Sequence, residues 1–198
     1  ATSSWGWNNQ GYVEYDSGNS DIPYAIVADD DGSIYVAGTV DPGNVKWRIM
    51  KFDPDGSTSS WGWNDQGYVE YDTGYNGGDA TSIDLDDEGN VYVFGYVNYS
   101  VAADWLIRKY DSTGATSTDW GWGNQGYVFW DSGGATDHGR SMDVDGVGNV
   151  YVAGEFGKTG NGYDWRIMKF KACDDTLISL GKFNISGSLT FATSTTYR

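Results

Sequence analysis

The stretch WGWNNQGYVEYD, at Trp5–Asp16, occurs three times in the chain and decides its architecture. It returns as WGWNDQGYVEYD at Trp61–Asp72 and as WGWGNQGYVFWD at Trp120–Asp131, and the sequence after each copy repeats as well. The length of the repeat, from Trp5 to Trp61 and from Trp61 to Trp120, indicates one supersecondary unit per repeat. Such units stack on their neighbours to bury a face that no unit can bury alone.

Each repeat contains four short segments that are rich in β-branched and aromatic residues and bounded by Gly, Asn and Asp, a pattern that predicts strands. The predicted strands are Tyr12–Tyr15, Ala25–Ala28, Ile34–Thr39 and Trp47–Phe52; Tyr68–Tyr71, Thr81–Leu85, Val91–Tyr96 and Trp105–Tyr110; and Tyr127–Trp130, Ser141–Val144, Val150–Glu155 and Trp165–Phe170. No stretch has helical period and length. The fold class is therefore all-β, with antiparallel repeats at residues 5–60, 61–119 and 120–172 and an extension at 173–198.

The turn between the second and third predicted strands of each repeat is the best-defined local feature. It reads DDDG at 29–32 and DDEG at 86–89. Asp accepts hydrogen bonds from nearby backbone amides, and Gly supplies the positive φ that closes the hairpin. The run from Asp84 also opens like a calcium-binding EF-hand loop, but Gly95 stands where that loop needs a bidentate Glu. We therefore predict a turn.

Three coincident segments carry a resemblance to a known repeat family: DDDGSIYVAG…WRIMKFDPDG, DDEGNVYVFG…WLIRKYDSTG and DGVGNVYVAG…WRIMKFKACD. They resemble the bacterial β-propeller repeats called SBBP repeats, over about residues 5–171. The resemblance implies four-stranded antiparallel blades around an axis and implies little about activity.

Three blades are too few for a closed ring, since propellers typically have four to eight. Three explanations stay open. The chain is a piece of a longer protein, or two chains pair into six blades, or the repeats form a pseudo-threefold β-trefoil or β-prism.

The amino-acid composition excludes some classes of binding partner. The formal net charge is −16, and a polyanion repels phosphate backbones and anionic lipid, so we expect no nucleic-acid partner. No apolar run is long enough for membrane insertion. The abundance of Trp, Tyr, Gly, Asn, Ser and Thr is typical of an extracellular all-β protein, which favours a secreted or cell-surface location.

The sequence after Cys173 no longer follows the repeat. Phe183, Ile185, Leu189 and Phe191 alternate with small polar residues, which predicts a strand with one apolar face. A single strand is not stable in water and must pair with a sheet edge. It either caps its own domain or completes a neighbour's sheet, and head-to-tail donation of this kind builds fibres. As the only cysteine, Cys173 is either partly buried or joined to a second chain.

Repeated Trp pairs are the candidate ligand-binding residues: Trp5 and Trp7, Trp61 and Trp63, and Trp120 and Trp122. In an extended segment both members of such a pair face the same way, and flat indoles stack on sugar rings. The competing interpretation is that these rings fill the space between blades, which their recurrence beside Gly favours. Asn98 and Asn184 begin acceptor sequons for glycosylation.

A catalytic set is missing from the sequence. His138 is the only histidine, and neither a Ser-His-Asp arrangement nor a transition-metal ligand set can be assembled around it. We therefore predict that the protein is not an enzyme and that it has no catalytic residue, no metal site and no cofactor.

These observations favour a structural repeat protein that associates with itself. The leading hypothesis is a secreted or cell-surface subunit of an extracellular polymer or fibre, joined by strand exchange through its C-terminal segment. The alternative is a lectin-like propeller that binds glycans through its Trp pairs.

Overall fold

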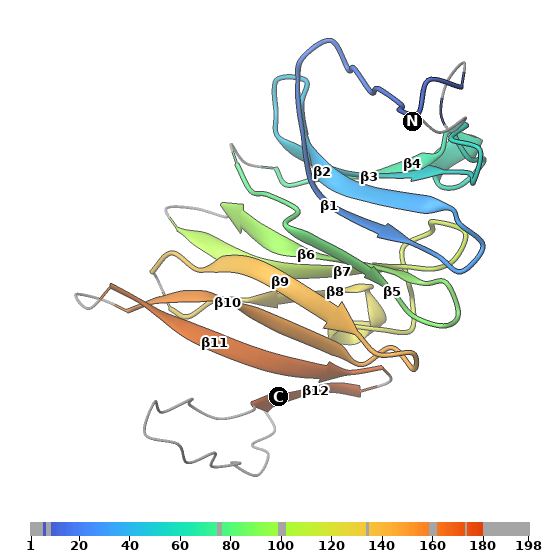
Figure 1. Cartoon of the computed structure of the whole chain (residues 1–198). Helices are drawn as coiled ribbons and strands as arrows, with labels where there is room; N and C mark the ends of the chain where they lie inside the picture. Colours follow the sequence, from blue (N-terminus) through green and yellow to red (C-terminus); the bar gives the residue numbers. More distant parts are fainter. Residues whose placement is uncertain are drawn as a thin grey trace.

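The chain folds into three separate four-stranded antiparallel sheets that lie face to face in chain order (Figure 1). The computed structural model describes residues 6, 9–74, 77–98, 102–133, 135–158, 162–172 and 174–179. We call the three sheets blades 1, 2 and 3. Their arrangement confirms the all-β, propeller-like fold class predicted from the sequence. It leaves no place for the pseudo-threefold β-trefoil or β-prism alternative, because in the described part of the chain each sheet packs on its neighbours in sequence and blades 1 and 3 do not pack on each other.

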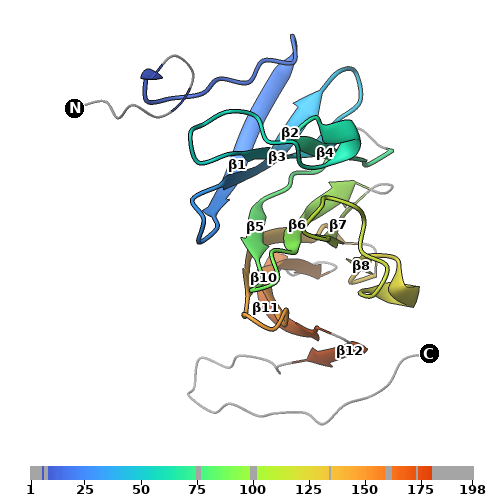
Figure 2. The ribbon, with the colours of Figure 1, turned by 90° about the vertical axis from the view of Figure 1, so that its right-hand side faces the viewer.

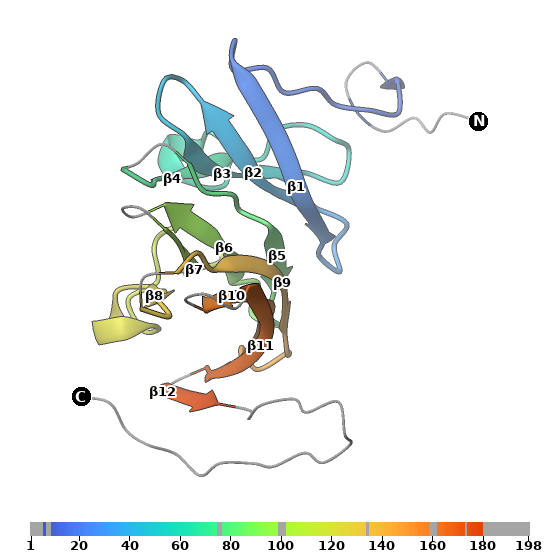
Figure 3. The same ribbon diagram turned by 90° about the vertical axis from the view of Figure 1, so that its left-hand side faces the viewer.

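The strands follow one order in every blade, each paired with the next. Blade 1 contains β1 (Ser20–Ala28), β2 (Ile34–Asp41), β3 (Lys46–Phe52) and β4 (Tyr68–Asp72); blade 2 contains β5 (Ser82–Leu85), β6 (Val91–Asn98), β7 (Ala103–Tyr110) and β8 (Tyr127–Trp130); blade 3 contains β9 (His138–Val144), β10 (Val150–Lys158), β11 (Gly162–Lys171) and β12 (Asp174–Ser179). Two 3-10 turns, η2 (Trp63–Asp65) and η3 (Trp122–Asn124), precede β4 and β8. The first strands β1, β5 and β9 lie along one edge of the stack (Figure 3), and β4 and β8 lie along the opposite edge (Figure 2).

The blades are offset from the sequence repeats by one strand. The strand that opens the second repeat, β4, is the outer strand of blade 1, and the strand that opens the third repeat, β8, is the outer strand of blade 2. The predicted strand Tyr12–Tyr15 is not formed; within it, Tyr12 makes only an isolated bridge to Gly6. Blade 3 is completed by β12, which is not a copy of the repeat and was not predicted.

Hydrogen bonds at the predicted turns explain their sequence. In blade 2, the Asp86 carboxylate accepts bonds from the backbone N–H of Glu88 and of Asn90, at 3.0 and 2.9 Å. Gly89 follows with φ +76°, a left-handed conformation that other residues adopt at a cost. The turn interpretation is confirmed, and the carboxylate that an EF-hand would give to calcium holds the hairpin together instead.

A glycine in the middle of each second strand permits close strand pairing. A methyl group in place of the Gly95 α-hydrogen would lie 1.9 Å from the carbonyl oxygen of Asp79. The matching positions, Gly38 and Gly154, meet the preceding strand in the same way, at 2.3 Å and 2.4 Å. The Gly of the YVAG and YVFG motifs is therefore a requirement of strand packing.

Candidate functional site: the faces between and beyond the blades

The seam between blades 1 and 2 is built by alternation along the strands. Trp47 and Ile49 of β3 point toward blade 2 and are fully buried against Val91 and Val93 of β6. The Trp47 indole N–H also donates to the carbonyl of Gly78, at 3.2 Å. Burial of this kind stabilises a fold in proportion to the apolar area removed from water.

The seam between blades 2 and 3 repeats this design at the matching positions. Trp105 and Ile107 of β7 are buried against Val150 and Val152 of β10. The Trp105 indole N–H donates to the carbonyl of Glu155, at 3.2 Å. Each blade therefore offers one face to the next blade and the opposite face to the one before it.

In blade 3, the face that blades 1 and 2 turn toward the next blade is not covered by any described residue. Trp165 and Ile167 of β11 match the buried pairs of the two seams, yet Trp165 is 88% exposed and Ile167 is 42% exposed. We call this surface, which also includes Tyr151 and Ala153 of β10, the tail face. Trp165 stands at the position where Trp47 and Trp105 are buried, and it is exposed because no described blade follows blade 3.

Blade 1 presents the opposite face, also uncovered. Ile26 of β1 is 68% exposed, whereas Ile83 and Met142 at the matching positions of blades 2 and 3 are buried in the seams. Ile34 and Val36 of β2 are half-buried. We call this surface, together with Met50 and Phe52 of β3, the head face.

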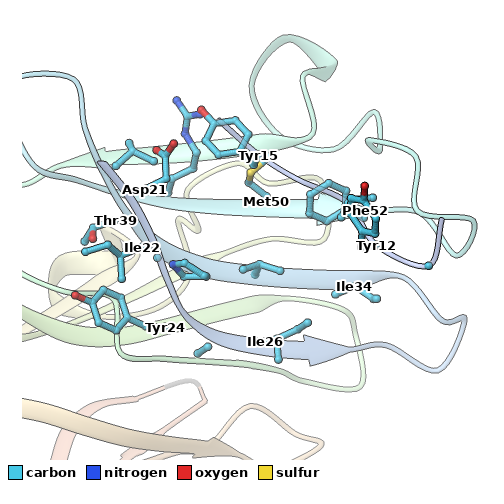
Figure 4. A pocket seen from close by; sticks show the side chains of 18 residues that line it. Tyr12, Tyr15, Asp21, Ile22, Tyr24, Ile26, Ile34, Thr39, Met50 and Phe52 are labelled. Carbon is cyan, nitrogen blue, oxygen red and sulfur yellow. The ribbon is translucent and has the colours of Figure 1, made fainter. Parts of the chain in front are cut away.

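A groove of about 610 Å³ runs over the head face and is lined mainly by apolar side chains. Figure 4 shows Tyr12 and Tyr15 on one side of the groove and Ile22, Tyr24 and Ile26 along β1 on the other. Burial and the nearby Asp79 raise the pKa of the Tyr24 hydroxyl, which is therefore neutral at pH 7.

The N-terminal segment reaches the head face through contacts that recur at both seams. In each case an aromatic ring, from the N-terminal segment before blade 1 or from the outer strand β4 or β8 at a seam, lies within cation–π range of an arginine of the blade that follows. The distances from guanidinium carbon to ring centre are 4.8 Å for Arg48 over Tyr15, 4.2 Å for Arg108 over Tyr71 and 4.6 Å for Arg166 over Trp130. Burial in its seam holds the pKa of Arg166 below its usual value.

A backbone hydrogen bond to the preceding segment also recurs in blades 1 and 2. Gly6 N–H donates to the carbonyl of Asp55 in blade 1 at 3.1 Å, and the matching Gly62 N–H donates to the carbonyl of Thr113 in blade 2 at the same distance. The segment thus lies against blade 1 as β4 lies against blade 2.

Tryptophans of the WGW motif occupy two different environments. Trp61 and Trp120 are buried and contact Tyr35 and Tyr92 edge to face, each at 5.7 Å. Their rings therefore have no open face for a sugar, which corrects the stacking prediction for both and supports the packing interpretation. Trp63 is 48% exposed.

Trp61 and Trp63 do not face the same way, although both members of such a pair would do so in an extended segment. Gly62 between them has φ +82°, and the chain turns there into η2. Trp122 begins η3 at the matching position of the next repeat.

Other predicted residues divide between described and undescribed parts of the chain. Asn98 is half-buried at the end of β6. Trp5, Trp7, Cys173, Asn184 and the assembly residues Phe183, Ile185, Leu189 and Phe191 lie outside the described residues.

Three carboxylates gather at the edge of blades 2 and 3, a cluster that sequence reasoning missed because its members come from different strands and loops. One oxygen each of Asp104, Asp131 and Asp137 lies within 4.8 Å of the others. Asp137 is fully buried and accepts bonds from Ser132 N–H and Oγ–H and from Gly157 N–H, each at 2.9 Å. Burial, with the charges of Asp131 and Asp137, raises the pKa of Asp104 to about 7. Because of this raised pKa, Asp104 keeps its proton below about pH 7, which reduces the repulsion among the three carboxylates.

His138 lies at the start of β9 beside Glu155. The two side chains approach to 3.6 Å, and the buried His138 Nδ1 has no hydrogen-bond partner among the described residues. Hydrogen bonds from Arg140, together with the charge of Arg140 and the neighbouring His138, hold the pKa of Glu155 below its usual value. Neither a serine nor a cysteine contacts this pair within the described chain.

The fold and its repeated seams define a β-propeller repeat protein. A family described as a β-propeller domain of unknown function, DUF5122, matches residues 30–58, which run from the first hairpin turn of blade 1 to just beyond β3. No protein of curated function matches the chain. No helix among the described residues is long and apolar enough to cross a membrane.

Proposed function

We propose that the protein is a non-enzymatic structural repeat protein, secreted or held at the cell surface, that associates with copies of itself into an extracellular polymer. One observation carries this proposal: both ends of the blade stack expose the apolar face that is buried at every internal seam. A matched pair of apolar faces rimmed by polar side chains is typical of an interaction surface. The high negative charge keeps such a subunit soluble until its ends meet.

The proposal includes the finer assignments of the sequence. We take the three units as SBBP-type repeats, Asn98 and Asn184 as glycan acceptors, and the segment with Phe183, Ile185 and Leu189 as a donor strand that extends the polymer.

The mass of the native particle tests the proposal. Light scattering behind a sizing column, with electron micrographs of the same fractions, should give dimers or larger assemblies that dissociate on dilution. A chain that stays monomeric at high concentration contradicts it. Deletion of residues 180–198, which keeps β12 and therefore all four strands of blade 3, tests the donor strand separately. Fibres should shorten to small oligomers, and unchanged fibres would refute the donor strand and leave self-association in place.

Lectin-like binding is the second candidate, favoured by the exposed aromatic rings of Tyr12, Tyr24 and Trp63. Rings of this kind stack on sugars. A glycan array followed by titration of any ligand found would test it. Trp63→Ala should weaken the binding of that ligand. An affinity that neither Trp63→Ala nor Tyr12→Ala changes would refute the lectin-like function.

A further inference from the structure

The first copy of the repeated outer strand, Gly11–Asp16, has no sheet among the described residues. The second and third copies are β4 and β8, which close blades 1 and 2. The first copy nevertheless lies against blade 1 through the same arginine–aromatic contact, Arg48 over Tyr15. It therefore occupies the place of the outer strand of a blade that would precede blade 1.

A blade in that place would also need three inner strands, and the groove over the head face lies where they would pack. By the pattern of both internal seams, the strands that fit there carry a Trp and an Ile facing Ile34 and Val36. Blade 3 carries this pair, Trp165 and Ile167, on its uncovered tail face.

At the matching place on β11, no described residue pairs with the outer edge of the strand. In blades 1 and 2, the repeated strand pairs Tyr71 with Trp47, and Trp130 with Trp105. In blade 3, β12 pairs only from Met168 onward, so the edge at Trp165–Ile167 has no register partner among the described residues.

We propose that copies of this chain join head to tail by building one shared blade. Strands β9–β11 of one copy dock on the head face of a second copy, and Gly11–Asp16 of the second copy pairs with β11 as the fourth strand. The register of the internal blades, where Ile49 lies opposite Val69 and Ile107 opposite Val128, places Val13 opposite Ile167. This inference rests on the proposed function and specifies its interface.

Within the described residues, the incoming strand overlaps β12 where Ser179 and Ile178 lie opposite Met168 and Lys169, so the joint requires this end of β12 to leave β11. The Trp165 indole gains a cover like the one over Trp47 and Trp105. Two such joints close a ring of six blades, and repeated joints that do not close form a fibre.

Single-cysteine variants in a Cys173→Ser background test the joint. Val13→Cys and Ile167→Cys are purified separately, mixed, oxidised and analysed on non-reducing gels with mass spectrometry of the linked peptides. Directly opposite residues of an antiparallel pair lie within disulfide distance. We expect covalent dimers in the mixture and none from either variant alone. Glu14→Cys mixed with Ile167→Cys is the control, because Glu14 falls opposite Arg166 and faces the other side of the sheet.

The outcomes separate the two proposals. If the particle mass shows assembly but the Val13→Cys and Ile167→Cys mixture gives no more disulfide-linked dimer than the control, the shared blade is refuted and self-association still stands. If the chain is monomeric, both proposals are refuted. Trp165→Ala adds a readout without engineered thiols. It should raise the dissociation constant about 30-fold or more, as for a central interface tryptophan, and leave the monomer folded. Unchanged assembly would refute the docking.

Discussion

Replacing Trp105 with Ala removes the side chain that joins blades 2 and 3. The indole is buried, contacts the Phe94 ring edge to face at 5.4 Å and the Trp130 ring at 5.0 Å, and donates its N–H to the carbonyl of Glu155. All three contacts disappear in the variant, and the space left between two sheets cannot collapse without moving one blade.

The expected loss of stability follows from these contacts. Truncation of a buried Trp to Ala costs about 3–5 kcal/mol, and this range includes the ring contacts. Leaving a carbonyl at the seam without its donor brings the loss to the upper part of that range. Small domains are stable by only about 5–15 kcal/mol in total. A loss of about 4–5 kcal/mol, at about 2–4 °C per kcal/mol for a chain of this size, should lower Tm by about 8–20 °C.

Thermal unfolding followed by circular dichroism and by calorimetry measures the effect, with Trp63→Ala as the matched control. Trp63 is 48% exposed in η2, so its loss should change stability by less than about 0.5 kcal/mol. A Trp105→Ala protein within about 1 kcal/mol of the parent would refute the argument that the seams hold the blades together.

The remaining predictions concern single positions within the blades. Gly95→Ala should lower stability by about 1–3 kcal/mol, because the added methyl group meets the neighbouring strand; a Tm equal to that of the parent would contradict the close pairing. Asp86→Ala should cost about 1–3 kcal/mol through the loss of the turn's hydrogen bonds, whereas the exposed Asp30→Ala should be neutral. Because the pKa of Asp104 is raised to about 7, the folded chain keeps a proton that the unfolded chain loses above about pH 4, so this group lowers stability as the pH rises between those values. Asp104→Asn should remove that slope in urea titrations across this range, and an unchanged slope would refute the raised pKa of Asp104.

Local features of the fold were predictable because the sequence carries their cause. The acidic turns, the alternating strands and the threefold repeat each depend on neighbouring residues. The grouping of strands into blades was not predictable, because a periodic sequence has no preferred starting point. Only the pairing of β4 with β3 and of β8 with β7 shows that a blade crosses the repeat boundary.

Environment separates residues that the sequence presents as equals. Trp47, Trp105 and Trp165 hold matching positions in the three repeats, yet only the first two are buried. Burial at this position depends on whether another blade follows. Trp61 and Trp63 separate for a local reason, because the left-handed Gly62 turns the chain between them. The end faces, which carry the proposed assembly, were therefore visible only in three dimensions.

The one-strand offset has a consequence for how such a chain can change in length. Each unit of sequence supplies the closing strand of the blade before it and the inner strands of the blade after it. Gain or loss of whole units by recombination therefore adds or removes internal blades and leaves the two termini chemically the same. If copies join through their end faces as we propose, arrays of different copy number would still bind one another, and the spacing along the polymer would vary without any change in the joint.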